Sequence, residues 1–263
     1  MILVKVGGGA SVNLKGIAFD LGELGEPAVV VHGANAARDD LAARLGVPKR
    51  TVISESGVES VFTDAEALEV LTMAYAGLVN KRFVALCQQN GVNAIGLTGL
   101  DGALIRGRRN RGIRVADNGR RRLLHDDSGK PVSVNTALLG LLLGAGYTPV
   151  VTVPILDEEG RAINTENDEV TALLQRTLGA EVVVQLIESP GLLSDPARPE
   201  SLLATLGRDE IETRERDSSG RFRRKLMALR KMMDSGCRRI VVGDGRLPHP
   251  LRSALSLEGT VIE

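Results

Sequence analysis

The fold is decided by the stretch Val4-Lys5-Val6-Gly7-Gly8-Gly9-Ala10, in which a short apolar strand runs directly into three glycines. Glycines at the carboxyl end of a strand let backbone N–H groups approach an anion closely, and Lys5 adds a positive charge beside them. The stretch lacks both the P-loop pattern and the G-x-G-x-x-G of a dinucleotide fold. It indicates a phosphate cradle, with a purely structural glycine turn as the alternative.

A second strand repeats this arrangement in Val30-Val31-His32-Gly33-Ala34-Asn35. Its turn is expected beside the first at the carboxyl edge of a sheet, where two anion-receptive turns suit a substrate with two charged groups. Histidine side chains ordinarily titrate near neutral pH, which makes His32 a candidate general base. The alternative is a histidine that only forms local hydrogen bonds.

Short β-branched runs alternate with helical patterns along the rest of the chain, which predicts a mainly parallel sheet covered by helices. A capping box at Thr63-Asp64-Ala65-Glu66 predicts a long helix to about Gln89. The segment 192–216 is polar and is expected to be a loop-rich connection. The strands are expected at 2–6, 28–31, 92–97, 149–153, 181–186, 239–242 and 260–262, and further helices at 35–45, 133–144, 168–178 and 224–235.

Composition excludes several classes of protein. The chain has 263 residues, with 33 basic and 33 acidic side chains, so its formal charge is zero. Neutral charge argues against bulk binding to nucleic acid, and an aromatic content of 2 % leaves few rings on which bases could stack. With 43 % hydrophobic residues, the chain is expected to fold as a globular protein.

The setting is expected to be cytoplasmic and without a membrane. Cys87 and Cys237 are far apart, which excludes a disulfide scaffold and a zinc-ribbon spacing. Lys5 and the glycines interrupt the start of the chain where a signal peptide needs an unbroken apolar stretch. The apolar runs are expected to be too short to span a bilayer.

The segment 106–124 carries many arginines and a single acid, Asp117. Asn118-Gly119 predicts a hairpin turn within it. In a neutral protein this is a local basic projection, and it is either a solvated hairpin or a docking surface for an acidic partner. Its arginines are Arg106, Arg108, Arg109, Arg111, Arg114, Arg120, Arg121 and Arg122.

Two further polar stretches begin helices. Ala162-Ile163-Asn164-Thr165-Glu166-Asn167-Asp168 has polar groups that are close enough to converge on one site, although Asp168 at a helix start is also a plausible N-cap. Gly220-Arg221-Phe222-Arg223-Arg224-Lys225 concentrates positive charge, as solvated helix faces commonly do.

Taken together and in this order, these stretches resemble the amino acid kinase family along the whole chain. The resemblance is strongest to its carrier-protein branch, the LysW-aminoadipate and LysW-glutamate kinases, which are related to N-acetylglutamate kinase. It is carried further by Gly77-Leu78-Val79-Asn80-Lys81-Arg82, by the segment 93–102, by Pro190-Gly191-Leu192-Leu193 and by the ending Glu258-Gly259-Thr260-Val261-Ile262-Glu263.

The resemblance implies transfer of the γ-phosphoryl group of ATP, with Mg²⁺ bound to the nucleotide, to a side-chain carboxylate, which gives an acyl phosphate. It implies a three-layer α/β/α sandwich, with a half at 1–155 that binds the acyl substrate and forms a homodimer and a half at 156–263 that binds ATP. The implied partner is a small acidic amino-group carrier protein, LysW-like, docked by the arginines.

The resemblance also assigns roles to single residues. Lys5 and Lys225 match the lysines that stabilise the transition state, and Asp168 matches the aspartate that holds them. Asn164 matches a contact to the acyl substrate. Gly8, Gly9, Gly33 and Ala34 match backbone donors around the phosphoryl group, and Glu188 and Gly191 lie at the nucleotide site, together with Lys225.

Three positions depart from the family pattern. Phe62 stands where relatives place an arginine that grips a substrate carboxylate, and a phenyl ring supplies neither charge nor a bidentate fork. Ala34 replaces a glycine, and Ser189-Pro190 follows Glu188 where relatives have a hydroxyl and then an acid or amide. These changes indicate retained chemistry with altered recognition. The alternatives are a free N-acetylglutamate kinase and a family member that binds a carrier or nucleotide without catalysis.

Overall fold

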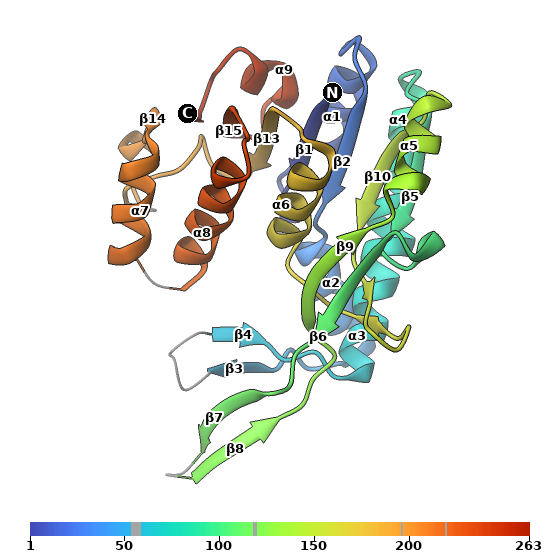
Figure 1. Ribbon diagram of the computed structural model, residues 1–263, viewed down its shortest axis with the longest axis vertical. Coiled ribbons are helices and arrows are strands. Elements are labelled where there is room, and N and C mark those ends of the chain that lie inside the picture. The colour runs from blue at the N-terminus through green and yellow to red at the C-terminus, as the bar shows by residue number, and fades with distance from the viewer. Residues whose placement is uncertain (54–58, 118–119, 196, 219) are drawn as a thin grey trace.

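A computed structural model describes residues 1–53, 59–117, 120–195, 197–218 and 220–263. A central sheet of eight strands runs through the molecule in the order β14-β16-β15-β13-β1-β2-β10-β5 (Figure 1). Its pairs are parallel except for β15 with β16. The strands are β1 (Ile2–Val6), β2 (Ala28–His32), β5 (Ala94–Thr98), β10 (Thr148–Thr152), β13 (Val182–Ile187), β14 (Thr205–Leu206), β15 (Arg239–Asp244) and β16 (Thr260–Ile262).

Helices cover both faces of the sheet, which confirms the predicted three-layer α/β/α sandwich. One face packs on α1, α4 and α9 through Ile17, Phe83 and Leu251, and the other packs on α3, α6 and α8 through Leu71, Leu174 and Leu229. The helices are α1 (Leu14–Gly22), α2 (Asn35–Leu45), α3 (Ala65–Thr72), a π-helical segment (Met73–Val79), α4 (Asn80–Gln89), α5 (Thr136–Gly144), α6 (Asn167–Leu178), α7 (Arg208–Asp217), α8 (Gly220–Asp234) and α9 (Pro250–Leu255).

The two glycine turns are neighbours because β1 and β2 pair in register. Val6 lies opposite His32, and the amide of Gly33 donates to the carbonyl oxygen of Val6 at 2.9 Å. Both turns therefore leave the sheet at its carboxyl edge, where ligands bind in open α/β sheets.

The predicted long helix is present from Ala65 to Gln89, but its cap differs from the prediction. Asp64, not Thr63, is the N-cap, and its side chain accepts from the amide of Ala67 at 3.0 Å. The helix is also long and apolar enough to cross a membrane by length and composition, with a mean hydropathy of 1.2. This corrects the expectation that no apolar run is long enough. Leu71 and Phe83 lie fully in the core, as in the interior helix of a globular protein.

A second, four-stranded sheet has the order β12-β11-β6-β9 and consists of β6 (Ile105–Arg109), β9 (Gly129–Val134), β11 (Ile155–Leu156) and β12 (Ala162–Ile163). The predicted hairpin is confirmed as β7 (Ile113–Asp117) and β8 (Arg120–Leu124), paired from Asp117 with Arg120 outward; its turn, Asn118-Gly119, lies outside the described residues. The hairpin is shorter than predicted, because Arg106 to Arg109 belong to β6. A second hairpin, β3 (Thr51–Ile53) with β4 (Glu59–Val61), projects from the same end of the molecule (Figure 1).

The segment 192–216 is less irregular than expected. It contains β14 and most of α7, which is stabilised by the ion pair of Glu210 and Arg214 at 2.8 Å and packs through the buried Ile211. The sequence does not predict α7, because Ile211 is its one buried residue and the rest of its sequence is almost entirely polar. The short helices α1 and α9 were not predicted either.

Candidate functional site

The two glycine turns touch each other and form one side of a cleft. A Cβ on Gly8 would lie 2.5 Å from the amide nitrogen of Ala34 and 2.6 Å from that of Asn35, so a side chain at Gly8 would clash with the backbone at the start of α2. Among the described residues, the amides of Gly8 and Gly9 form no hydrogen bond, whereas the amide of Gly33 donates to the carbonyl oxygen of Val6. The cleft measures about 460 Å³ and is lined by Gly7, Gly8, Gly9, Asn35, Asp39 and Glu188.

A lysine and a carboxylate meet beside this cradle. Lys5, next to the last residue of β1, approaches Asp168 in the first turn of α6, with 2.9 Å between Nζ and Oδ1. Glu166 is the N-cap of α6, so the alternative role of Asp168 as N-cap is wrong. Burial alone would raise the pKa of Asp168, but the charges of Lys5 and Lys225 outweigh it and hold this pKa below its ordinary value. Asp168 therefore stays ionised between two ammonium groups.

Lys225 comes to the same place from α8, which packs against α6. Burial, and then the positive charge of Lys5, lowers the pKa of Lys225 to about 8, although Asp168 acts in the opposite direction. Two ammonium groups that are held together repel each other, and an anion between them relieves that repulsion. The pair is thus suited to stabilise negative charge that develops in a transferring group.

Gln185 is a further polar residue here that the sequence analysis did not single out. It is fully buried on β13, in register with Lys5 on the neighbouring strand, and neither amide atom has a hydrogen-bond partner among the described residues. The signal in the sequence is one polar residue inside the apolar strand 182–187. A buried amide without a hydrogen bond is energetically costly, which singles out Gln185 as a polar group beside Lys5.

Besides Lys225, two further predicted nucleotide contacts lie in different surroundings. The carboxylate of Glu188 accepts from the amide of Ser11 at 2.7 Å and lies over Gly9, where a Cβ would overlap it. Gly191 is buried, and a Cβ there would meet Leu202 and Thr260, so it packs inside the protein instead of lining the cleft.

The predicted acyl-substrate residues gather around Thr63. The side-chain amide of Asn164 donates to Thr63 Oγ1 at 3.1 Å, and Phe62 lies next to it at the end of the β3–β4 hairpin. The amide of Phe62 donates to the carbonyl oxygen of Arg50 at 2.9 Å, and the guanidinium of Arg50 contacts Asp64 at 3.2 Å. The structure thus places Asn164 against Thr63, which follows Phe62 in the sequence, and adds the exposed Arg50 nearby.

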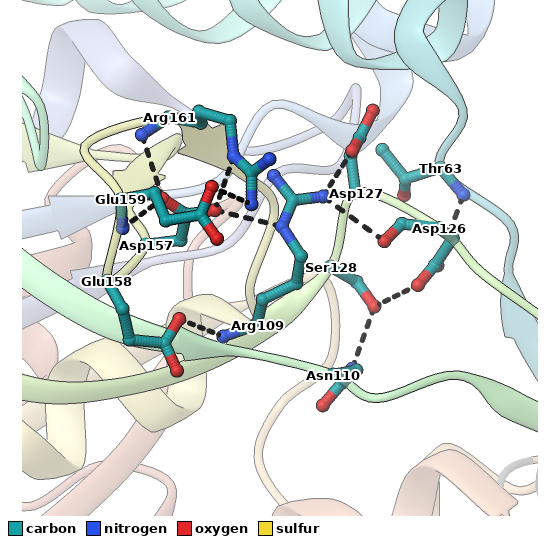
Figure 2. A network of polar contacts seen from close by, with 10 residues as sticks. All are labelled: Thr63, Arg109, Asn110, Asp126, Asp127, Ser128, Asp157, Glu158, Glu159 and Arg161. Carbon is teal, nitrogen blue, oxygen red and sulfur yellow. Dashed lines mark hydrogen bonds and ion pairs between the residues drawn. The ribbon is translucent and has the colours of Figure 1, made fainter.

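Arg109 has different surroundings from the other described arginines of the segment 106–124, because it contacts a buried carboxylate. Its Nε contacts Asp157 at 2.9 Å, and a second nitrogen pairs with Asp127, as Figure 2 shows. Asp157 has no exposed surface; burial alone would raise its pKa, but hydrogen bonds, led by the Arg161 amide and Arg109, lower this pKa to about 2. Arg109 is therefore half-buried, with a 23 % exposed side chain whose guanidinium is held by two carboxylates.

The network around Arg109 continues to the substrate side. The amide of Asp127 donates to the carbonyl oxygen of Thr63 at 2.7 Å, and the amide of Asn164 donates to the carbonyl oxygen of Asp127 at 2.8 Å. The carboxylate of Asp126 accepts from the hydroxyl of Ser128 at 2.6 Å and from the amide of Thr63 at 3.4 Å, which joins both residues to the network (Figure 2). Arg109 consequently fixes the backbone that carries Asn164 and Phe62.

The remaining arginines are exposed where their side chains are described. Arg106 and Arg108 alternate outward on β6, and Arg108 is 75 % exposed with an ion pair of 3.9 Å to Glu158. We call the exposed members Arg106, Arg108, Arg111 and Arg122 the arginine surface. Arg114, Arg120 and Arg121 lie on the hairpin strands, and their side chains lie outside the described part of the protein.

Comparison with known proteins agrees with this geometry. The model of the amino acid kinase family matches residues 1–244. The chain belongs to the amino acid kinase family. It is 42 % identical over 268 residues to the LysW-aminoadipate kinase of Thermus thermophilus, with both chains fully covered, and 39 % identical to that of Deinococcus radiodurans, over the whole chain and 91 % of the relative.

The fold has solved counterparts as well. The N-acetylglutamate synthase of Neisseria gonorrhoeae matches with a TM-score of 0.77 and 23 % identity over 99 % of this chain and 58 % of that one. This match shows the fold, and the family model together with the two relatives shows that the protein is an enzyme of the kinase class. In the part of the chain that the structure describes, no three His, Cys, Asp or Glu side chains group to hold a metal ion.

Proposed function

We propose that the protein uses ATP to phosphorylate the side-chain carboxylate of an aminoadipate or glutamate that is attached to a small acidic carrier protein. The observation that carries this proposal is the convergence of Lys5, Asp168 and Lys225 beside the glycine cradle. Its supporting context is the LysW-aminoadipate kinase activity named for the two relatives.

In the proposed step, an oxygen of the substrate carboxylate attacks the γ-phosphorus of ATP. The bond from that phosphorus to the bridging oxygen breaks, and ADP leaves with the electron pair. Lys5 and Lys225 neutralise the charge of the transferring group, Asp168 holds both ammonium groups in place, and the amides of Gly8 and Gly9 donate to its oxygens. Mg²⁺ would enter bound to the nucleotide phosphates.

The arginine surface is the proposed dock for the carrier. In a chain with no net charge, it concentrates positive side chains at one end, so an acidic partner would be steered to it. A second copy of the chain is a further proposed partner, in a homodimer. Met73 and Leu78 are 46 % and 40 % exposed on the helix 65–89 and offer apolar contact area, which light scattering would test.

The experiment is an ATP-consumption assay with carrier-linked aminoadipate, carrier-linked glutamate and free N-acetylglutamate, in which hydroxylamine traps any acyl phosphate. We expect a hydroxamate on a carrier-linked substrate and little turnover of the free one. Turnover of free N-acetylglutamate alone would assign the protein to the small-substrate reaction, and no turnover of any substrate would leave a binding role.

A further inference from the structure

His32 has both ring nitrogens engaged inside the protein. It is fully buried at the end of β2, with Nδ1 at 3.1 Å from the carbonyl oxygen of Gly33 and Nε2 at 3.0 Å from Nδ2 of Asn80. Asn80 lies at the start of α4, on the other side of the strand end. The imidazole thus connects the second glycine turn to the helix layer.

These contacts fix the protonation of the ring. A carbonyl oxygen only accepts, so Nδ1 carries the proton and donates to Gly33. The Asn80 amide nitrogen also donates to the carbonyl oxygen of Val150 at 3.0 Å, which sets its orientation and makes Nε2 of His32 the acceptor. Burial lowers the pKa of His32 to about 4, so the neutral form persists at physiological pH. The candidate role of general base is incompatible with two engaged nitrogens and no exposed surface.

The group that His32 holds is the peptide unit between Gly33 and Ala34. A peptide bond is planar, so fixing the Gly33 carbonyl also fixes the direction of the Ala34 N–H. This unit begins α2, whose first amide nitrogens lie against the bare Cα of Gly8 in the cradle. A second buried group holds the same end of α2, since the hydroxyl of Tyr75 donates to Oδ1 of Asn35 at 2.5 Å.

We propose that His32 is a positioning residue, whose Nδ1–H sets the Gly33–Ala34 peptide and thereby the distance between the first turn of α2 and the glycines of β1. The inference rests on the proposed function, because it assumes that this cradle receives the phosphates of ATP. Asn80 keeps the proton on Nδ1 by donating to the opposite nitrogen.

Two substitutions of His32 test its contact to Gly33 and its contact to Asn80 separately. His32→Asn keeps a donor near the position of Nδ1, and His32→Gln keeps a polar group near Nε2 while it removes the donor to Gly33. We expect His32→Gln to weaken binding of the non-hydrolysable analogue AMP-PNP, measured by calorimetry, and to lower kcat, each by about tenfold, as for one lost hydrogen bond. His32→Asn is expected to stay within about threefold of the unmodified protein. The control His249→Asn changes a histidine that contacts Asp20, away from the cleft.

Equal losses in His32→Asn and His32→Gln would overturn the proposal and leave His32 with a packing role. A ¹⁵N spectrum of the unmodified protein gives a test without substitution: Nδ1 is expected to show the shift of a protonated nitrogen and Nε2 that of an unprotonated one, and the reverse pattern would contradict the proposal. If no substrate is turned over, the proposed function fails, and the AMP-PNP affinities and this spectrum still decide the role of His32.

Discussion

Lys5 is 12 % exposed and meets Asp168 at 2.9 Å, whereas Arg108 is 75 % exposed and its ion pair with Glu158 is 3.9 Å long. We call Lys5, Asp168 and Lys225 the centre. There the carboxylate and the two ammonium groups come from different elements and attract each other, so their positions are fixed before any ligand arrives. On the arginine surface, the charges extend into water and are largely screened beyond a Debye length of about 10 Å. The first arrangement suits chemistry, and the second suits capture of a partner.

The largest expected effect is the removal of a charge from the centre. Lys225→Ala should lower kcat by about 100- to 1,000-fold, since it deletes a preorganised positive group from the transferring phosphoryl. Steady-state assays with a saturating carrier-linked substrate measure this. Lys231→Ala on the same helix removes an exposed lysine that pairs with Glu169 and should leave kcat unchanged. Near-normal turnover of Lys225→Ala would take this lysine out of the centre.

Arg108 and Arg109 are neighbours in sequence, but only Arg109 contacts a buried carboxylate, so their contributions to stability are expected to differ. Arg109→Ala leaves the buried carboxylate of Asp157 with one guanidinium fewer and should lower the free energy of unfolding by about 2 kcal/mol. Arg108→Ala should change it by less than about 0.5 kcal/mol, as exposed ion pairs contribute little. Denaturant unfolding of both variants checks this, and equal stabilities would contradict the division between interior and surface.

Charge reversal tests the surface itself. The triple variant Arg106→Glu, Arg108→Glu, Arg111→Glu should lower kcat/KM for the carrier-linked substrate by about tenfold at low salt and flatten its salt dependence, with kcat preserved. The triple variant Arg44→Glu, Arg176→Glu, Arg216→Glu makes the same change in net charge at other exposed arginines. If both triple variants lose activity equally, the effect is due to overall charge and the dock is not at this surface.

The smallest expected effect is a shift in pH dependence. The ammonium form of Lys225 is the active one, and its pKa of about 8 means that this charge is lost as pH rises through that value. The basic limb of kcat/KM for ATP, which reports on the free enzyme, should therefore fall near pH 8. Asp168→Asn removes a charge that raises this pKa, so the limb should move by about one pH unit to lower pH. An unmoved limb would show that another group titrates there.

Local sequence patterns are enough to predict strands, helices and turns, which depend on residues close together in the chain. The run from Val4 to Ala10, the turn after His32 and the alternation of strands and helices predict the sheet and its two neighbouring glycine turns, because strand ends and glycines act over a few residues. Lys225 was placed in the site by family resemblance, since its own stretch of basic residues is also typical of a solvated helix.

The features that the sequence does not predict have a common physical cause. The sequence groups Arg109 with the neighbouring arginines, but its partners Asp127 and Asp157 are 18 and 48 residues away, and no local pattern shows that they meet. Gln185 and the pairing of His32 with Asn80 depend equally on contacts between elements that are distant in sequence. The polar helix α7 was missed because one buried residue, Ile211, does not produce a helical period.

In the proposed division, Lys5, Asp168 and Lys225 carry the chemistry and the arginine surface carries recognition, and a comparison of two substrates separates the two. The arginine-surface variant would be assayed on the carrier-linked substrate and on a short peptide that carries the same linked amino acid without the acidic carrier. We expect kcat/KM of this variant to fall on the carrier-linked substrate and to be unchanged on the peptide, whereas Lys225→Ala should lose activity on both. An equal loss of the arginine-surface variant on both substrates would contradict this division.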